Sequence, residues 1–172
     1  HLGNTFGNCL NGLSADIKRK RARYIQRNNE ILQEFYFANP ETKNLINNIY
    51  NMSFTGSPIW DLFSDTMESM EKTFNKSIRL MWDIPLQTHK YLLEPVSGQT
   101  HLKFTFMKRF LQFKSQVMKS SKSVLKTIFS ICENDCGSTT GRNFRRIMLL
   151  CDKQSISDIE MKDIDKLTYR MI

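Results

Sequence analysis

Cysteine and histidine are the residue types in this chain that could hold a metal ion, and their spacing gives limited support for a metal site. Cys132 and Cys136 stand four residues apart, so both thiols could face one partner on a helix, with Cys151 as a third ligand. Zinc sites more often combine a Cys pair separated by about two to four residues with a second Cys or His pair. No second pair is evident, and the three histidines lack the short spacing of a metal pair. We expect buried apolar thiols, with zinc as the alternative, and no cofactor in this chain.

Catalytic motifs are missing from the sequence. It contains no G-x-S-x-G nucleophile turn, no H-E-x-x-H pair and no Gly-rich lysine loop. Asp61 and Asp65 lie one helical turn apart and could bind a cation, but helix capping accounts for them better. A self-contained enzyme is therefore the least favoured class.

The segment CGSTTGRNFRR has the composition of a phosphate-binding helix start. Ser138 and Thr139 can cap the helix, and Arg142, Arg145 and Arg146 would project from its first turns. A helix N-terminus attracts anions through its free N–H groups and its dipole, and guanidinium groups add charged hydrogen bonds. The alternative is a capped helix with solvated arginines.

The positive charge of the chain is concentrated in two blocks. The net charge is +8, with +4 on residues 1–30 and +8 on residues 100–153, against −3 on residues 31–99 and −1 on residues 154–172. Two basic blocks around an acidic middle indicate a polyanion as the partner. The alternative is that the lysines only solvate helix faces.

No stretch of about eighteen uninterrupted apolar residues occurs, and the N-terminus lacks a signal-peptide pattern. We therefore expect an intracellular protein that does not use a membrane as its partner.

We expect helices to position these residues. The chain has only four Pro and seven Gly in 172 residues, so few residues would interrupt a helix. The pattern predicts a mostly α, multi-helix bundle of eight or nine helices, with at most a short strand at the N-terminus. The expected helices cover approximately residues 14–37, 41–52, 58–63, 65–82, 88–94, 100–119, 123–134, 143–150 and 157–169.

Helical spacing also predicts which face of each helix is buried. Along residues 14–37, one apolar face is expected, and basic residues occupy the opposite one. The residues of that apolar face are Ile17, Tyr24, Ile25, Ile31, Leu32 and Phe35. Basic residues also lie on the outer face expected for residues 100–119. The basic residues on these faces are Arg19, Lys20, Arg23, Arg27, Lys103 and Lys108.

Two further assignments follow from the same periodicity. In residues 41–52 the apolar set is expected to face inward. Phe104 and Phe113 fall off the apolar face of residues 100–119, which leaves them as core residues or as rings for single-strand nucleic-acid stacking. The inward set of the 41–52 helix is Leu45, Ile46, Ile49 and Tyr50.

The order of several motifs resembles a known family. The step His1-Leu2-Gly3 resembles the primer-grip hairpin at the end of a reverse-transcriptase palm. KRKRARYIQRNNEILQEF, NIYN to GSPIWDLF, RLMWDIPLQTHKYLLEP and CGSTTGRNFRRIM follow in that order. This series resembles the segment after the palm in non-LTR (LINE-type) retrotransposon reverse transcriptases, over essentially the whole chain.

The resemblance implies a role for each part of the chain. Residues 1–13 would be the end of the palm, with Leu2 and Gly3 in the primer grip. Residues 14–87 would form a helical thumb and residues 88–172 a helical C-terminal extension. The polymerase aspartates and their Mg²⁺ would belong to the palm upstream, so the parent protein would be the RNA-directed DNA polymerase.

Partners are implied in the same way. They would be an RNA template, an RNA–DNA or DNA duplex, and the fingers and palm of the parent polyprotein, with a nuclear location during action on target DNA. The alternative function is a helical protein-interaction module of a domesticated element, without a polymerase role. A neutral, exposed apolar patch away from the basic face would favour that alternative.

Overall fold

The computed structural model describes residues 11–155 and 158–170 of the chain. In these ranges the fold is helical throughout and contains no strand, which confirms the prediction of a mostly α, multi-helix bundle. The expected N-terminal strand lies outside the described residues. The elements are α1 (Asn11–Glu34), α2 (Pro40–Asn51), η1 (Ser57–Ile59), α3 (Asp65–Met81), η2 (Lys90–Leu92), α4 (Leu93–Ser97), α5 (Leu102–Lys119), α6 (Ser123–Asn134), α7 (Thr139–Cys151) and α8 (Met161–Arg170).

Three of these helices do not start where the sequence predicts. Ser14, the expected cap of the first helix, lies inside α1. Ser138 caps α7 by accepting a hydrogen bond from the backbone N–H of Gly141 at 2.8 Å, so this helix starts four residues earlier than expected. The last helix starts at Met161, four residues later than the predicted 157.

The chain divides into two compact units. Unit 1 comprises the chain up to Gly56 together with Asp65–His101, and unit 2 comprises Ser57–Ser64 together with Leu102–Ile172. Each unit has buried aromatic residues of its own. The family resemblance predicts a different division, into residues 1–13, 14–87 and 88–172. That division stays a prediction.

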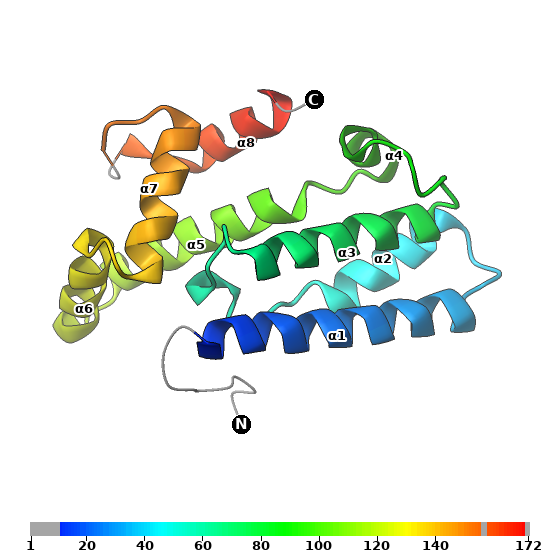
Figure 1. Ribbon diagram of the computed structural model, residues 1–172, viewed down its shortest axis with the longest axis horizontal. Helices are drawn as coiled ribbons and strands as arrows, with labels where there is room; N and C mark the ends of the chain where they lie inside the picture. Colours follow the sequence, from blue (N-terminus) through cyan, green and yellow to red (C-terminus); the bar gives the residue numbers. More distant parts are fainter. Residues whose placement is uncertain (1–10, 156–157, 171–172) are drawn as a thin grey trace. The chain divides into compact units, whose positions relative to one another are not determined.

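In unit 1, α1 packs against both α2 and α3, and Figure 1 shows α1 and α3 lying alongside each other. Tyr24 of α1 is 1% exposed and forms the centre of this packing. Its ring stacks on Phe54 at a centroid distance of 5.8 Å and meets Phe74 of α3 at 6.2 Å. The predicted apolar face of the first helix is buried only in part. Ile17 and Ile31 are buried too, whereas Ile25 and Phe35 are exposed and Leu32 is half-buried.

Helix α2 is oriented opposite to the prediction. Leu45, Ile49 and Tyr50 are 60%, 66% and 64% exposed, so the expectation that they face inward is wrong. The buried positions are instead the asparagines at 44, 47 and 51. A buried amide is tolerated when it is hydrogen-bonded, and this helix supplies such bonds along its whole inner face.

Partners of these asparagines come from α1 and from α2 itself. Asn51 donates through Nδ2 to Oδ1 of Asn47 at 2.9 Å and to the backbone carbonyl of Tyr24 at 3.3 Å. Asn47 donates to the Tyr24 hydroxyl at 3.4 Å. Tyr24 of α1 therefore accepts hydrogen bonds from two asparagines of α2. These bonds determine which face of α2 is turned towards α1.

The other end of α2 is tied to the turn after α4. Asn44 donates to the backbone carbonyl of Ser97 at 3.2 Å, and Gln99 donates to Asn44 and, at 2.7 Å, to Asn48. Gly98, which lies between Ser97 and Gln99, has φ = 65°. Glycine adopts this left-handed conformation at the end of a helix with the least strain. The polar inner face of α2 thus extends into the α4 turn.

In unit 2, α5 contacts η1, α6 and α8. Trp60, which follows η1, is fully buried and meets Phe106 of α5 edge-on at 5.4 Å. Asn143 of α7 donates to the Trp60 carbonyl at 2.8 Å and accepts from the Leu62 N–H at 3.1 Å. This single amide fixes the segment Ser57–Ser64 to a helix more than 80 residues away in the sequence.

Phe104 and Phe113 belong to the packing of unit 2. Phe104 is 3% exposed, and the half-buried Phe113 meets Phe129 of α6 edge-on at 5.9 Å. Phe129 in turn contacts Phe144 of α7 at 6.0 Å. The packing therefore supports a core role for these two rings rather than stacking with single-stranded nucleic acid.

Candidate nucleic-acid interface

A row of positive side chains lies along one side of α1, and its last residue reaches α2. The positions of Arg19, Lys20, Arg23 and Arg27 follow helical spacing, and we call them the α1 cation row. Arg23 and Arg27 are exposed, whereas Arg19 and Lys20 are half-buried. From the first to the last residue the row rises about 12 Å along the helix axis.

The charges of this row act on one another. Partial burial lowers the pKa of Lys20, and Asp16 acts against this effect. Arg19, Arg23 and Arg27 each lower the same pKa further, because a neighbouring positive charge disfavours protonation. The four cations and Asp16 therefore lie close enough for their charges to act on one another. Arg19 also forms an ion pair of 2.6 Å with the buried Asp16, which fixes one end of the row.

Two arginines of α1 reach neighbouring elements of unit 1. Arg27 donates through Nη1 to the backbone carbonyl of Tyr50 at 2.6 Å, at the last turn of α2. Arg21, which is not in the row, turns towards α3 and donates to Oγ1 of Thr73 at 2.6 Å. The guanidinium of Arg23 stays exposed between these anchored neighbours.

Unit 2 brings together two predicted residues that are far apart in the sequence. Nζ of Lys103 on α5 lies 4.6 Å from the centroid of the Phe63 ring, and the guanidinium carbon of Arg146 on α7 lies 5.3 Å from the same centroid. Arg146 also donates to the Phe63 carbonyl at 3.2 Å. Both positive groups therefore lie beside the same aromatic ring. We call this arrangement the Phe63 cluster.

The start of α7 uses most of its predicted phosphate ligands for its own structure. The hydroxyl of Ser138 caps the helix. Arg142 donates to the Gly137 carbonyl at 2.6 Å, to Oδ2 of Asp61 at 3.1 Å and to the Thr139 hydroxyl at 3.3 Å. Ser138, Thr139 and Arg142 therefore stabilise the turn before α7.

Gly141 explains why that turn is compact. A Cβ atom at this position would lie 2.2 Å from the backbone oxygen of Asp135 and 3.1 Å from Nη2 of Arg145. The backbone at Asp135 therefore approaches residue 141 more closely than a side chain there would allow. The guanidinium of Arg145 also lies next to this glycine. Arg145 and Arg146 consequently point to different surroundings, and only Arg146 joins the Phe63 cluster.

Lys108 forms an ion pair with Asp165 of α8, so its charge is partly compensated. Leu2 and Gly3, the predicted primer-grip residues, lie outside the described residues. Six of the predicted cations thus form two groups, the α1 cation row in unit 1 and the Phe63 cluster in unit 2, while Lys108, Arg142 and Arg145 belong to neither.

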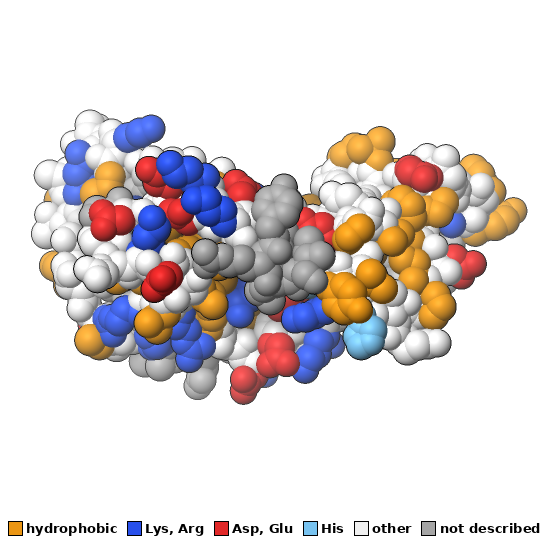
Figure 2. Space-filling view, turned by 90° about the horizontal axis from the view of Figure 1, so that it is seen from above, with side chains coloured by type: hydrophobic (Ala, Val, Ile, Leu, Met, Phe, Trp, Pro, Cys, Tyr) orange, Lys and Arg blue, Asp and Glu red, His pale blue; other side chains and the backbone are white. Residues whose placement is uncertain are grey.

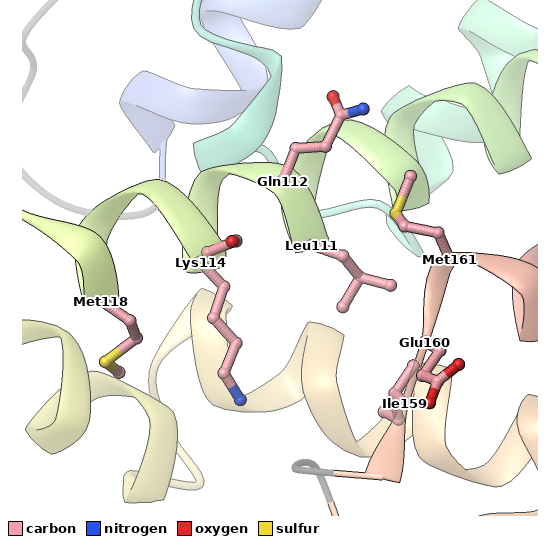
Figure 3. Close-up of a pocket in the computed structure, with 8 residues that line it drawn as sticks. Leu111, Gln112, Lys114, Met118, Ile159, Glu160 and Met161 are labelled. Carbon is pink, nitrogen blue, oxygen red and sulfur yellow. The ribbon is translucent and has the colours of Figure 1, made fainter.

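A cavity of about 410 Å³ lies in unit 2, between α5 and the residues that precede and begin α8 (Figure 3). Its apolar lining includes Leu111, Met118 and Ile159. Its two charged residues are already paired, since Lys114 binds Glu133 at 2.6 Å and Glu160 binds Lys162 at 2.6 Å. The cavity therefore suits an apolar group better than a phosphate.

The thiols do not all follow the prediction. Cys136 is exposed, which contradicts the expectation of a buried thiol, and Cys132 and Cys151 are half-buried. In the described part of the chain, no group of three or more His, Cys, Asp or Glu residues is placed to hold a metal ion. No helix in that part is long and apolar enough to cross a membrane.

Sequence patterns missed two aromatic residues beside the cations. Helical spacing gives no cation partner for Phe63, and it predicts Tyr50 on the inner face of α2. The contact of Lys103 and Arg146 with Phe63 joins three distant parts of the sequence. The Arg27–Tyr50 contact depends on the rotation of α2. Neither contact has a local sequence signal.

Comparison of the chain with protein-family models, with curated proteins and with solved structures gave no match. The grounds for a functional proposal are therefore the ordered motifs of the sequence and the placement of charge in the two units.

Proposed function

We propose that this chain is a non-catalytic segment of a non-LTR retrotransposon reverse transcriptase that grips the duplex of RNA template and cDNA primer. The observation that carries the proposal is the α1 cation row, in which Arg19, Lys20, Arg23 and Arg27 follow helical spacing along a helix that is fixed by its buried residues. The absent palm of the parent polyprotein would supply the aspartates and Mg²⁺ for nucleotidyl transfer, at target DNA in the nucleus.

The α1 cation row fits a sugar–phosphate backbone in size and charge. Its rise of about 12 Å equals the axial rise of about three to four nucleotides of one strand, at about 3.4 Å each. Cations that neutralise phosphates release counterions and bind without reading the sequence. A thumb needs this property because it must hold whatever sequence is being copied.

The Phe63 cluster offers a second phosphate contact, in unit 2. A cation over an aromatic face is attracted by the ring, which restrains its long side chain. Lys103 and Arg146 are therefore both held at the Phe63 ring. A phosphate that binds either cation would be attracted by the other as well.

Neutralising the α1 cation row tests the proposal. In the Arg19→Ala, Arg23→Ala, Arg27→Ala triple variant, affinity for a blunt RNA–DNA hybrid should fall roughly tenfold or more at low salt. The loss should be alike for hybrids of different sequence, because phosphate contacts carry no base information. Fluorescence anisotropy with labelled hybrids measures both quantities.

A matched control removes the same amount of charge elsewhere in unit 1. Lys72, Lys76 and Lys90 are exposed on α3 and η2, so their replacement by Ala lowers the net charge equally. The control should bind nearly as tightly as the wild type. Equal losses in the two triple variants would reduce the effect to net charge, and a loss confined to one sequence would contradict a thumb-like role.

Protein–protein interaction is the second candidate, and exposed apolar surface in unit 1 favours it. Leu45 and Ile49 on α2 are more than half exposed, and Leu86, Leu92 and Val96 near α4 are 57%, 43% and 46% exposed. Figure 2 shows hydrophobic side chains gathered over the part of unit 1 that contains α4. Apolar surface of this kind is typical of docking sites. This candidate is a helical interaction module of a domesticated element, and it gains if the triple variant binds the hybrid as the wild type does.

A further inference from the structure

We propose that Tyr50 is a stacking platform for an unpaired base next to the α1 cation row. The inference rests on the proposed function and adds a ligand class to it. A single-stranded extension of the duplex would continue from the cation row onto this tyrosine. The ring would hold the base, and the arginines would hold the phosphates beside it.

The position of Tyr50 is fixed by a contact from the row itself. Arg27, the last residue of the row, donates to the backbone carbonyl of Tyr50 at 2.6 Å. The neighbouring Asn51 donates to the Tyr24 carbonyl of α1 at 3.3 Å. The last turn of α2 is therefore anchored to α1 on both sides of the bond between residues 50 and 51, and Tyr50 cannot move away from Arg27 without breaking these bonds.

The ring of Tyr50 is left available by the unusual rotation of α2. Because Asn47 and Asn51 occupy the inner face, the tyrosine is 64% exposed rather than in the core. Tyr24, the other tyrosine at this contact, is buried and stacks on Phe54. In the described residues, the Tyr50 ring has no stacking partner, so its faces can accept one.

An exposed aromatic ring beside cations is the arrangement that binds single-stranded nucleic acid. Every base offers a π-face, so stacking tolerates any sequence, and adjacent cations track the backbone. This is the same tolerance that a thumb requires of its phosphate contacts. The phenol hydroxyl takes no part in stacking, so phenylalanine should serve equally well.

Tyr36 provides a matched control in the same unit. It is 77% exposed and precedes α2, whereas Tyr50 lies in the last turn of that helix. The length of α2 separates the two positions by about 18 Å along its axis. Tyr36 therefore controls for the removal of an exposed tyrosine ring without removing the one that Arg27 contacts.

The experiment compares a blunt RNA–DNA hybrid with the same hybrid carrying about four unpaired nucleotides on its RNA strand. Affinities are measured by fluorescence anisotropy for the wild type, Tyr50→Ala, Tyr50→Phe and Tyr36→Ala. Arg27 contacts a backbone atom of Tyr50, so all these variants keep that hydrogen bond. Circular dichroism before each titration confirms that the helix content is unchanged.

The wild type should bind the extended hybrid more tightly than the blunt one. Tyr50→Ala should weaken binding of the extended hybrid by about tenfold, and should leave the blunt hybrid unchanged. Tyr50→Phe and Tyr36→Ala should behave as the wild type. An unchanged affinity in Tyr50→Ala, or an equal loss in Tyr36→Ala, would overturn the inference.

The two proposals fail in different ways. If the α1 triple variant weakens the blunt hybrid and Tyr50→Ala changes nothing, the gripping function stands and the stacking platform is wrong. If the wild type binds neither hybrid, the proposed function is wrong and the stacking platform falls with it.

Discussion

Asn47 illustrates how one polar side chain directs the packing of a helix. It is 1% exposed, donates to the Tyr24 hydroxyl at 3.4 Å and accepts from Asn51 at 2.9 Å. Removing it leaves both partners buried with an unmade hydrogen bond, and such a loss typically costs more than the bond itself contributes.

Asn47→Ala should therefore lower the free energy of unfolding by about 1–3 kcal/mol. Ile49→Ala, on the exposed side of the same helix, should change it by less than about 0.5 kcal/mol. Urea unfolding followed by circular dichroism measures both values. The opposite ranking would return Ile49 to the core and contradict the orientation of α2.

Sequence patterns identify buried residues correctly where the two faces of a helix differ strongly. In α1 the arginines mark one face as solvent-facing, and Ile17 and Tyr24 are buried as predicted, whereas Ile25 at the edge of the predicted face is exposed. In α2 the asparagines and the apolar residues both follow helical spacing, and hydropathy favours the wrong set. The deciding groups are the hydroxyl and carbonyl of Tyr24, which a pattern within α2 cannot reveal.

Helix α8 begins with a cap to which an acidic side chain contributes. Oδ2 of Asp163 accepts a hydrogen bond from the backbone N–H of Glu160 at 2.9 Å, which is one of the two bonds of a capping box. This bond, with smaller contributions from Lys153, Lys166 and Lys162, holds the pKa of Asp163 below the usual aspartate value. Burial of the carboxyl acts in the opposite direction.

The stability of unit 2 should consequently depend on pH in the acid range. Since the pKa of Asp163 is lower in the folded state, its stabilisation is fully present above the unfolded pKa of about 3.9. It is lost as the pH falls through the lower folded value. Asp163→Asn should reduce stability near neutral pH by about 1 kcal/mol and flatten the decline on acidification.

Urea unfolding at a series of pH values measures this difference. Asp83→Asn, at an exposed position of unit 1, is the control for removal of one carboxylate. A decline in Asp163→Asn as steep as in the wild type would mean that other carboxylates set the acid sensitivity.

Helix existence is easier to predict than helix limits. The start of α7 was placed too late because Gly141 and the hydroxyl residues before it have the composition of a loop. The hydrogen bond from Gly141 to Ser138 and the close approach of Asp135 make the same residues the first turn of a helix. Both effects depend on contacts between the turn and the helix, so composition alone does not locate the boundary.

At the scale of the whole molecule, the two basic regions allow a test of whether the cations bind phosphates or only aid solubility. If the positive charge serves to bind phosphates, the logarithm of the affinity for an RNA–DNA hybrid should fall linearly with the logarithm of salt concentration. The slope should become shallower by about one for each phosphate contact removed.

The Arg19→Ala, Arg23→Ala, Arg27→Ala variant should thus lose about three from the magnitude of the wild-type slope. Lys103→Ala with Arg146→Ala should lose about two, if the Phe63 cluster contacts phosphates as well. Titrations at several salt concentrations provide the slopes. A nearly flat wild-type dependence would contradict phosphate neutralisation in both units.

Composition predicts the basic blocks and the mostly α class, but it does not predict how the chain is divided. Residues 57–64 lie between α2 and α3 in the sequence, yet they belong to unit 2. They contact α5, and Asn143 of α7 binds both Trp60 and Leu62. A contact over so long a separation leaves no periodic trace in the sequence.

This assignment has a practical consequence for anyone who wishes to dissect the protein. The backbone passes between the units after Gly56, after Ser64 and again after His101. Cutting after His101 would remove α5 and α7, and the large indole of Trp60 would lose the surroundings that keep it from water. Clean separation requires excising Ser57–Ser64 and rejoining the ends with a short linker, while the C-terminal piece needs that excised peptide added back in trans.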